Sequence, residues 1–139
     1  MILNSVNILL VEDNLTTLRA LEILLRADGY VVHTAEGYQT ALDVAKREKV
    51  NFAICDINLW DGDGCELLGE LQKLQPMQGI AVTGYTLEDE TEHYRDSGFA
   101  VVLRKPVDHS QIASAISRLS CMDRGTNPVA ERPVGEPMA

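Results

Sequence analysis

Short apolar runs alternate with amphipathic stretches along the chain as far as about residue 120. Each apolar run is rich in aliphatic residues and short enough for a buried strand, and each following stretch repeats apolar residues at helical spacing. The pattern therefore predicts strands and helices in alternation. The predicted strands are 6–11, 30–35, 52–56, 79–83 and 99–103, and the predicted helices are 15–25, 38–47, 65–74, 87–96 and 109–119.

This alternation predicts a single α/β domain built on a doubly wound, five-stranded parallel sheet, that is, a flavodoxin-like (βα)5 fold. Parallel strands need crossover connections, and right-handed crossovers place helices on both faces of the sheet. Strand order 2-1-3-4-5 is the common one for a sheet of this size. In this order the first and third strands are neighbours, so residues at their carboxyl ends share one edge of the sheet.

Acidic residues stand at the carboxyl ends of the first and third predicted strands. Glu12 and Asp13 follow the first strand, and Asp56 ends the third. Ligands of open α/β sheets bind outside the carboxyl ends of strands, so we expect the three carboxylates to form one site. Carboxylates that lie close together raise each other's pKa unless a cation compensates. Mg²⁺ binds one or two carboxylates and keeps several waters, which suits an open site of this kind.

Two further residues at strand ends would complete a pocket for a phosphoryl group. Thr83 ends the fourth strand with a hydroxyl, and Lys105 follows the fifth strand with a compact positive charge. A carboxylate, a metal ion, an ammonium group and a hydroxyl are the groups needed to transfer a phosphoryl group to a side chain. Asp56 is the candidate nucleophile because it stands alone at its strand end, and Glu12 and Asp13 are the candidate metal ligands.

Composition narrows the function further. The formal net charge of -9, from 21 acidic against 12 basic residues, argues against direct nucleic-acid binding, because contacts with phosphates supply most of that affinity. The sequence shows neither an apolar run long enough to span a membrane nor a secretory leader, so we expect a cytoplasmic protein with no membrane partner. The three cysteines lack C-x-x-C spacing and are expected to be structural.

Five short motifs, in order along the chain, resemble the receiver domain of two-component response regulators over roughly residues 5 to 120. The motifs are Val11-Glu12-Asp13-Asn14, Cys55-Asp56, Asp63-Gly64, Thr83-Gly84 and Lys105-Pro106. Any one of them would be weak on its own, whereas five in order are specific. Agreement across several levels of sequence and structure is what identifies a family.

The resemblance implies roles for the acids and for one further residue. Asp56 matches the aspartate that accepts the phosphoryl group. Glu12 and Asp13 match the acids that bind Mg²⁺ together with it. Asn58 matches the residue whose backbone carbonyl is a further ligand of the metal. A protein of this kind is not a conventional enzyme, because it catalyses its own phosphorylation from a phosphodonor and its own slow dephosphorylation.

The resemblance also implies that Thr83 and Lys105 contact the phosphoryl group and couple phosphorylation to a small rearrangement. Pro106, which follows that lysine, is expected after a cis peptide bond. Two positions depart from the family pattern. Trp60 stands where a proline is usual, and Val102 stands where the aromatic residue of the conformational switch is usual.

Two residues near the acceptor are expected to modulate the reaction. Tyr85, two residues after Thr83, is the candidate substitute for the missing switch aromatic. Asn58 and Tyr85 flank the expected path of a hydrolytic water, so the resemblance implies that they set the lifetime of the phosphoryl group. The substitute role of Tyr85 rests only on its position along the chain.

The predicted receiver domain covers 5–122, and the segment 123–139, with three of the five prolines, is expected to be a disordered tail or a linker. A receiver implies a histidine kinase or a histidine phosphotransfer protein as donor, and a downstream effector protein. We expect a monomer, or a weak dimer that uses the face of the fourth helix, fifth strand and fifth helix. The 98–99 and 105–108 segments resemble receivers of hybrid histidine kinases, so a stand-alone receiver and a fragment of such a kinase are both open.

Three other functions can be compared with this one. A pseudo-receiver would use the same fold as a protein-binding module without phosphoryl chemistry, and the missing aromatic at Val102 keeps this alternative open. An aspartyl-phosphate hydrolase of the dehalogenase type would need an acid where Asn58 stands, two residues after Asp56. A flavin or nucleotide binder would need a glycine-rich loop after the first strand, where the sequence has Glu12-Asp13-Asn14.

Overall fold

The computed structural model describes residues 6–84 and 88–123 of the chain. Strands and helices alternate as predicted, with two additional short strands after β3. In chain order the elements are β1 (Asn7–Val11), α1 (Leu15–Ala27), β2 (Val31–Ala35), α2 (Tyr38–Arg47), β3 (Phe52–Asp56), β4 (Asn58–Leu59), β5 (Gly62–Asp63), α3 (Gly64–Leu74), β6 (Gln78–Thr83), α4 (Glu88–Asp96), β7 (Phe99–Arg104) and α5 (His109–Asp123).

One parallel sheet runs through the centre of the domain. Its five strands lie in the order β2-β1-β3-β6-β7. Counting only the strands of this sheet, the order is 2-1-3-4-5, which confirms the predicted flavodoxin-like (βα)5 fold. The register places Val11 beside Cys55 and Asp56 beside Val82. The carboxyl ends of β1, β3 and β6 therefore meet at one edge of the sheet.

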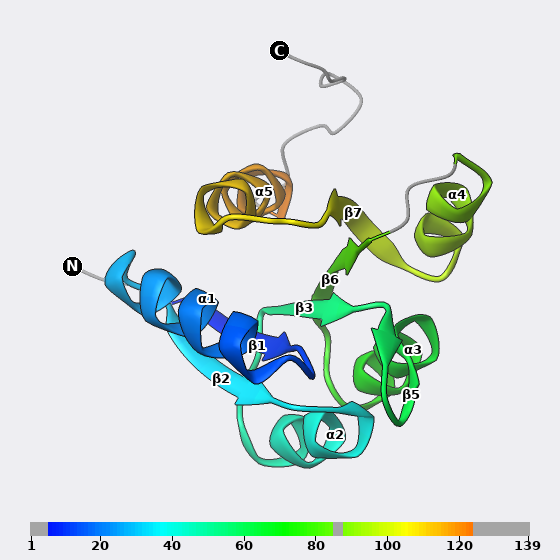
Figure 1. The fold of residues 1–139 in the computed structure, drawn as a ribbon, viewed down its shortest axis with the longest axis horizontal. Coiled ribbons are helices and arrows are strands. Elements are labelled where there is room, and N and C mark those ends of the chain that lie inside the picture. The colour runs from blue at the N-terminus through cyan, green and yellow to red at the C-terminus, as the bar shows by residue number, and fades with distance from the viewer. Residues whose placement is uncertain (1–5, 85–87, 124–139) are drawn as a thin grey trace.

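Helices cover both faces of the sheet, α1 and α5 on one side and α2, α3 and α4 on the other (Figure 1). Successive residues of a strand point to opposite faces. In β1, Ile8 and Leu10 pack in the core on the side of α1 and α5, whereas Leu9 and Val11 pack in the core on the side of α2 and α3. All four side chains are buried. The central strands β1, β3 and β6 are thus buried on both sides, as a covered parallel sheet requires.

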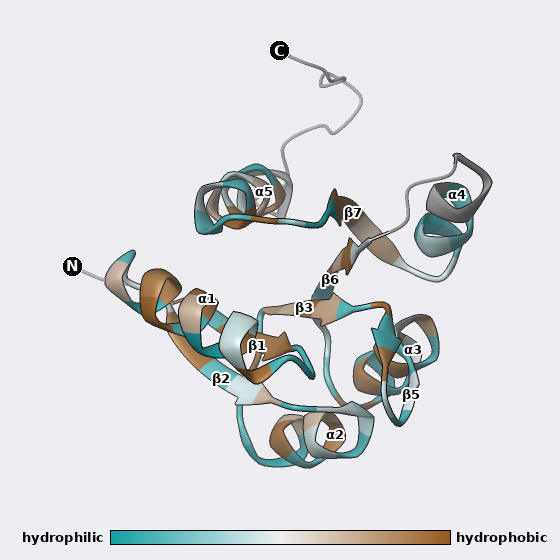
Figure 2. Cartoon of the chain, viewed as in Figure 1, coloured by the Kyte–Doolittle hydropathy of each residue, from teal (hydrophilic) through white to brown (hydrophobic). Residues whose placement is uncertain are grey.

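Helix α4 is strongly polar, and Figure 2 shows its described part in mostly hydrophilic colours. Tyr94 is its buried anchor and packs into the core formed with α3. Its neighbours Glu92, His93, Arg95 and Asp96 are exposed. The described part of α4 is thus held to the core mainly through Tyr94.

Helix ends follow local signals in the sequence. The side chain of Asn14 accepts a hydrogen bond from the N–H of Thr17 at 3.0 Å and caps α1. Gly29 and Gly98 follow α1 and α4 with φ values of 103° and 115°. These are left-handed conformations that glycine adopts without steric penalty.

The two short strands form a feature that the sequence did not predict. Strands β4 and β5 pair antiparallel, so residues 58–63 form a small hairpin after β3. The sequence pattern indicates only a turn here, because strands of two residues are too short to show an alternation of apolar and polar positions. The hairpin lies directly beyond Asp56, the last residue of β3.

None of the helices in the described part of the chain is long and apolar enough to cross a membrane. Helix α5 continues to Asp123. The rest of the predicted tail, residues 124–139, lies outside the described residues.

Candidate functional site

Three carboxylates from two strand ends meet at the carboxyl edge of the sheet. Glu12 and Asp13 follow β1, and Asp56 is the last residue of β3. One oxygen from each of the three lies within 4.8 Å of the others. Glu12 is 4% exposed and Asp56 6% exposed, whereas Asp13 is half-buried. The structure thus brings together the three acids that the sequence predicted to converge.

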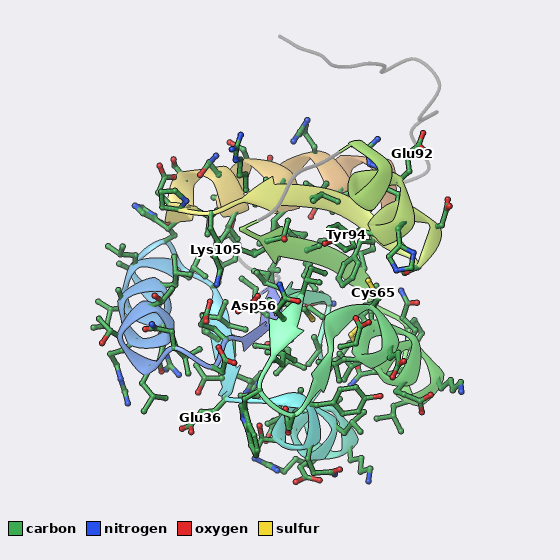
Figure 3. The ribbon with its side chains drawn as sticks, turned by 45° about the vertical axis from the view of Figure 1, so that its right-hand side comes forward. Glu36, Asp56, Cys65, Glu92, Tyr94 and Lys105 are labelled. Atoms are coloured by element: carbon green, nitrogen blue, oxygen red, sulfur yellow. The ribbon has the colours of Figure 1, made fainter. Side chains whose placement is uncertain are left out.

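Lys105 follows β7 and reaches back to the acids, and Figure 3 shows its side chain extending toward Asp56. The Nζ atom lies 3.0 Å from Oδ2 of Asp56 and 3.2 Å from Oε1 of Glu12. Burial lowers the pKa of Lys105, but hydrogen bonds to Asp56 and Glu12 and their negative charges together raise it above the usual value. The ammonium group is therefore charged and shared between two buried carboxylates.

The environment of Glu12 disfavours its charged form, mainly because the side chain is buried. Burial raises the pKa of Glu12, while a hydrogen bond of 3.0 Å from the N–H of Asn14 lowers it. The charge of Asp56 raises the pKa again, and Lys105 lowers it. The net direction is upward. One ammonium group therefore does not fully offset burial and repulsion among these acids.

The hairpin orients the other two carboxylates through its main chain. The N–H of Asn58 donates to Oδ1 of Asp56 at 3.2 Å. The N–H of Trp60 donates to Oδ2 of Asp13 at 2.9 Å. Hydrogen bonds from N–H groups to carboxylates are charge-assisted and stronger than those between neutral groups. The segment after β3 thus fixes one oxygen of each acid.

Thr83 ends β6 next to the acidic cluster and is fully buried. Its predecessor Val82 pairs with Asp56 in the sheet, and the N–H of Lys105 donates to the carbonyl oxygen of Thr83 at 2.8 Å. The peptide bond between Lys105 and Pro106 is cis, the isomer that the resemblance implied. Sheet register therefore gathers Asp56, Thr83 and Lys105 from three neighbouring strands.

The donor set of the cluster suits a hard divalent cation. Its three carboxylates carry three negative charges and Lys105 returns one positive charge, which leaves two negative charges for an ion to offset. Carboxylate oxygens favour Mg²⁺, Ca²⁺ or Mn²⁺ over metals that prefer nitrogen or sulfur ligands. A receiver domain generally binds Mg²⁺ at such an acidic pocket, and the residues present here fit that ion.

Asp63 and Gly64, which form one of the five motifs of the resemblance, shape the site. Oδ1 of Asp63 accepts from the N–H of Cys65 at 2.7 Å and caps α3. A Cβ atom on Gly64 would lie 2.5 Å from the carbonyl oxygen of Asp56 and 2.9 Å from Cα of Ile57. Glycine therefore lets α3 begin close to the end of β3. The Asp-Gly pair was visible in the sequence, but this close approach depends on tertiary packing.

The positions that depart from the family pattern have different surroundings. Val102 is half-buried, pairs with Ala81 of β6 and packs against the core on the side of α2 and α3. Trp60 is 76% exposed, although its N–H contacts the cluster. Tyr85, the predicted substitute for the switch aromatic, lies outside the described residues.

Comparison with known proteins agrees with the fold and with the motifs. The family model described as "Response regulator receiver domain" matches residues 8–117. The transcriptional regulatory protein GlrR of Escherichia coli K12 is 36% identical over 111 residues, which cover 79% of this chain and 25% of that protein. The chain thus spans about a quarter of the length of the first curated relatives that it matches.

Solved structures show the same architecture. The chain matches a CheY-like receiver domain from Methanospirillum hungatei JF-1 with a TM-score of 0.81 and 29% identity, covering 89% of this chain and 100% of that one. It also matches a response regulator from Burkholderia pseudomallei, solved with a phosphorylated aspartic acid, a calcium ion and citrate, with a TM-score of 0.76 and 27% identity over 89% and 76% of the two chains. The fold, the acidic edge of the sheet and these matches together mean that the chain belongs to the response regulator receiver domain family.

Proposed function

We propose that this chain accepts a phosphoryl group on Asp56 within a two-component phosphorelay and signals by a conformational change that depends on phosphorylation. The observation that carries the proposal is the placement of the Asp56 carboxylate. Oδ2 of Asp56 contacts the ammonium group of Lys105 at 3.0 Å, and Oδ1 accepts from the N–H of Asn58 at 3.2 Å. A nearly buried carboxylate held in this way, beside two further acids, is a suitable nucleophile for phosphoryl transfer.

In the proposed reaction a carboxylate oxygen of Asp56 attacks the phosphorus of the donor. An acyl phosphate forms while the bond from phosphorus to the leaving atom breaks. When the donor is a phosphohistidine, an imidazole nitrogen leaves with the electron pair and takes up a proton. Lys105 offsets charge on the transferred oxygens, and Thr83 donates a hydrogen bond to one of them. Attack by water later restores Asp56 and releases inorganic phosphate.

We assign the metal site to the carboxylates of Glu12, Asp13 and Asp56 and to the backbone carbonyl of Asn58. Bound Mg²⁺ would offset charge on the phosphoryl oxygens. The two uncompensated negative charges of the cluster support this assignment. The calcium ion and phosphorylated aspartic acid named for the Burkholderia pseudomallei response regulator are consistent with a hard cation beside the acceptor in this family.

Incubation with acetyl phosphate and Mg²⁺, followed by measurement of the intact mass, tests the proposal. The wild-type protein is expected to gain the mass of one phosphoryl group. The Asp56→Asn variant, which keeps the size of the side chain but lacks the nucleophile, is expected to gain none. Absence of an adduct on the wild type, or an equal adduct on Asp56→Asn, would refute the role of Asp56.

The modulating roles of Asn58 and Tyr85 are part of the proposal. Asn58 begins the hairpin with an exposed side chain, a position open to an incoming water. Substituting Asn58 or Tyr85 is expected to change the rate at which phosphorylated protein loses its adduct. Tyr85→Ala is also expected to reduce the difference in partner affinity between phosphorylated and unphosphorylated protein. An unchanged difference would show that Tyr85 does not replace the switch aromatic.

We infer that a histidine kinase or a histidine phosphotransfer protein supplies the phosphoryl group in the cytoplasm and that an effector protein reads the result. We further propose that residues 5–122 form the complete receiver, as a monomer or as a weak dimer through the α4-β7-α5 face. Phosphotransfer profiling against candidate kinases and phosphotransfer proteins, with Asp56→Asn as control, would identify the donor.

A second candidate function is a pseudo-receiver that binds a protein partner without phosphoryl chemistry. The observation that favours it is Val102, an aliphatic residue packed against the core where the family switch uses an aromatic one. This alternative predicts no adduct from acetyl phosphate in any variant. It also predicts a partner affinity that is insensitive to Asp56→Asn.

A further inference from the structure

The β4-β5 hairpin lies between the acidic cluster and the amino end of α2. Its first residue, Asn58, donates to Asp56, and its third residue, Trp60, donates to Asp13. The next residue, Asp61, contacts α2 through its side chain. One short segment therefore touches two acids of the cluster on one side and a helix on the other.

Asp61 caps a helix that is distant in sequence. Its Oδ1 accepts from the N–H of Tyr38 at 2.7 Å, and its Oδ2 lies 3.3 Å from the N–H of Gln39. The residue at the start of α2 is Gly37, which has no side chain to accept these bonds. Free N–H groups at a helix start favour a carboxylate. The first turn of α2 thus obtains its carboxylate from the hairpin.

Two glycines make the contact between hairpin and helix close. A Cβ atom on Gly37 would lie 2.7 Å from Nε1 of Trp60 and 2.8 Å from Oδ1 of Asp61. A Cβ atom on Gly62 would lie 2.5 Å from the ring atom Cδ2 of Tyr38. The hairpin and α2 therefore fit against each other without room for a side chain at either glycine. Movement of the hairpin away from α2 would break the bonds of Asp61.

The peptide unit between residues 60 and 61 joins the cap to the cluster. Trp60 is adjacent to Asp61, so the bonds from α2 to Asp61 restrict where the N–H of Trp60 can lie. That N–H holds Oδ2 of Asp13 at 2.9 Å. Proline, the residue that the resemblance leads one to expect at position 60, has no N–H and could not make this bond.

We propose that Asp61 is a positioning residue for the metal site, acting through the N–H of Trp60 on Asp13. The inference deepens the proposed function and rests on it. By capping α2, Asp61 fixes the hairpin, and the fixed hairpin orients Asp13 before a cation binds. Hydrogen-bond partners of metal-binding side chains contribute strongly to affinity, and their loss typically weakens binding by about 10-fold to 100-fold.

A simpler reading is that Asp61 only adds negative charge near the cation. Asparagine distinguishes the two readings, because it caps helices about as well as aspartate but carries no charge. If capping matters, Asp61→Asn retains an acceptor for the 2.7 Å bond from Tyr38, although not for the 3.3 Å bond from Gln39, and it keeps more of the cation affinity than Asp61→Ala does. If charge alone matters, Asp61→Asn and Asp61→Ala lose the same affinity.

The experiment measures Mn²⁺ affinity, with electron paramagnetic resonance reporting the free ion. Mn²⁺ is the probe because it shares the preference of Mg²⁺ for carboxylate ligands. Asp61→Ala is expected to weaken binding by about 10-fold, the lower end of the range for outer hydrogen-bond partners. Trp60→Pro, which deletes the N–H, is expected to weaken it as much, whereas Trp60→Phe keeps the N–H and is expected to bind as wild type does.

A remote variant controls for lost stability. Asn51 accepts from the N–H of Asn7 at 2.8 Å, near the opposite edge of the sheet, and Asn51→Ala removes a hydrogen bond without touching the hairpin. Its Mn²⁺ affinity is expected to match wild type, and thermal unfolding checks that each variant is folded at the titration temperature. Equal affinity of Asp61→Ala and wild type, or equal losses in Asp61→Asn and Asp61→Ala, would overturn the inference.

Phosphorylation of the same variants separates this inference from the proposed function. If wild type neither binds Mn²⁺ nor forms an adduct with acetyl phosphate, the proposed function and the positioning role both fail. If wild type does both and Asp61→Ala is unchanged in both, only the positioning role fails. At saturating Mg²⁺, Asp61→Ala is expected to recover most of its rate of adduct formation, since the variant keeps Asp56 and Lys105.

Discussion

Replacing Lys105 with methionine tests how much its ammonium group offsets the charge of the acidic cluster. The group lies 3.0 Å from Asp56 and 3.2 Å from Glu12, whose side chains are 7% and 5% exposed. Methionine keeps the length of the side chain but removes the charge. Two nearly buried carboxylates then remain next to Asp13 with no internal cation. We expect the protein without metal to lose stability.

The magnitude follows from the contacts. Opposite unit charges about 3 Å apart attract by roughly 5 kcal/mol at an effective dielectric constant of about 20. Removing one partner of a fully buried ion pair costs about 3–5 kcal/mol. The Lys105 side chain is 34% exposed, so solvent screens part of this interaction and we expect a loss of about 2 kcal/mol. For a domain of this size that corresponds to a decrease of about 8 °C in Tm.

A surface pair in the same protein provides the matched control. Lys73 contacts Glu70 at 3.0 Å, but these side chains are 74% and 47% exposed. Lys73→Met is expected to cost no more than about 0.5 kcal/mol. Thermal and chemical unfolding, each with and without Mg²⁺, measures both variants. Mg²⁺ is expected to narrow the difference between Lys105→Met and wild type, because the ion replaces the lost positive charge.

The pH dependence has a definite sign. The pKa of Glu12 is raised above its usual value of 4.5 in the folded protein. Its contribution to the free energy of unfolding therefore falls as the pH rises from 4.5 through the raised pKa and the carboxyl group ionises. Removal of the Lys105 ammonium group makes the ionised form of Glu12 still less favourable in the folded protein. The loss in Lys105→Met should therefore be larger at neutral pH than at mildly acidic pH. A loss no larger than that of Lys73→Met, at every pH and unaffected by Mg²⁺, would refute the reasoning.

Three further predictions concern glycines and thiols. Gly64→Ala is expected to destabilise the protein and to reduce phosphorylation, because its Cβ atom would lie 2.5 Å from the backbone oxygen of Asp56, the proposed acceptor. Unfolding and adduct formation measure the two effects. Gly69→Ala is expected to stabilise α3 by about 0.5–1 kcal/mol in the same unfolding assay, since a Cβ atom there has no neighbour within 4 Å. In a Cys121→Ser variant, Cys55 and Cys65 are expected to resist thiol reagents until the protein unfolds. Burial raises the pKa of both thiols, that of Cys55 to about 12, so little reactive thiolate is present. Rapid labelling of the folded protein would contradict this expectation.

Much of the fold could be predicted because its signals are local. Apolar strands, helical periodicity and caps such as Asn14 lie within short windows of the chain, and they fixed the order of the elements. The convergence of Glu12, Asp13 and Asp56 also followed, because strand order determines which strand ends are neighbours.

The contacts of the hairpin could not be predicted in the same way. Asp61 and its partner Tyr38 are 23 positions apart, and nothing in either segment indicates the other. The close approach at Gly37 also leaves no signal in the sequence. The backbone of Gly37 is extended, and any residue can adopt that conformation. Contacts of this kind depend on how helices and strands pack against one another in three dimensions. Local sequence patterns do not encode this packing.

The use of main-chain groups to hold the acids has a consequence for how such a protein can diverge. A substitution changes a side chain but leaves the amide in place, except when the new residue is proline. The outward-facing side chains at Asn58 and Trp60 are exposed, while their amides hold Asp56 and Asp13. The side chains at these two positions can therefore vary among descendants of this sequence, while the backbone contacts that orient Asp56 and Asp13 are kept.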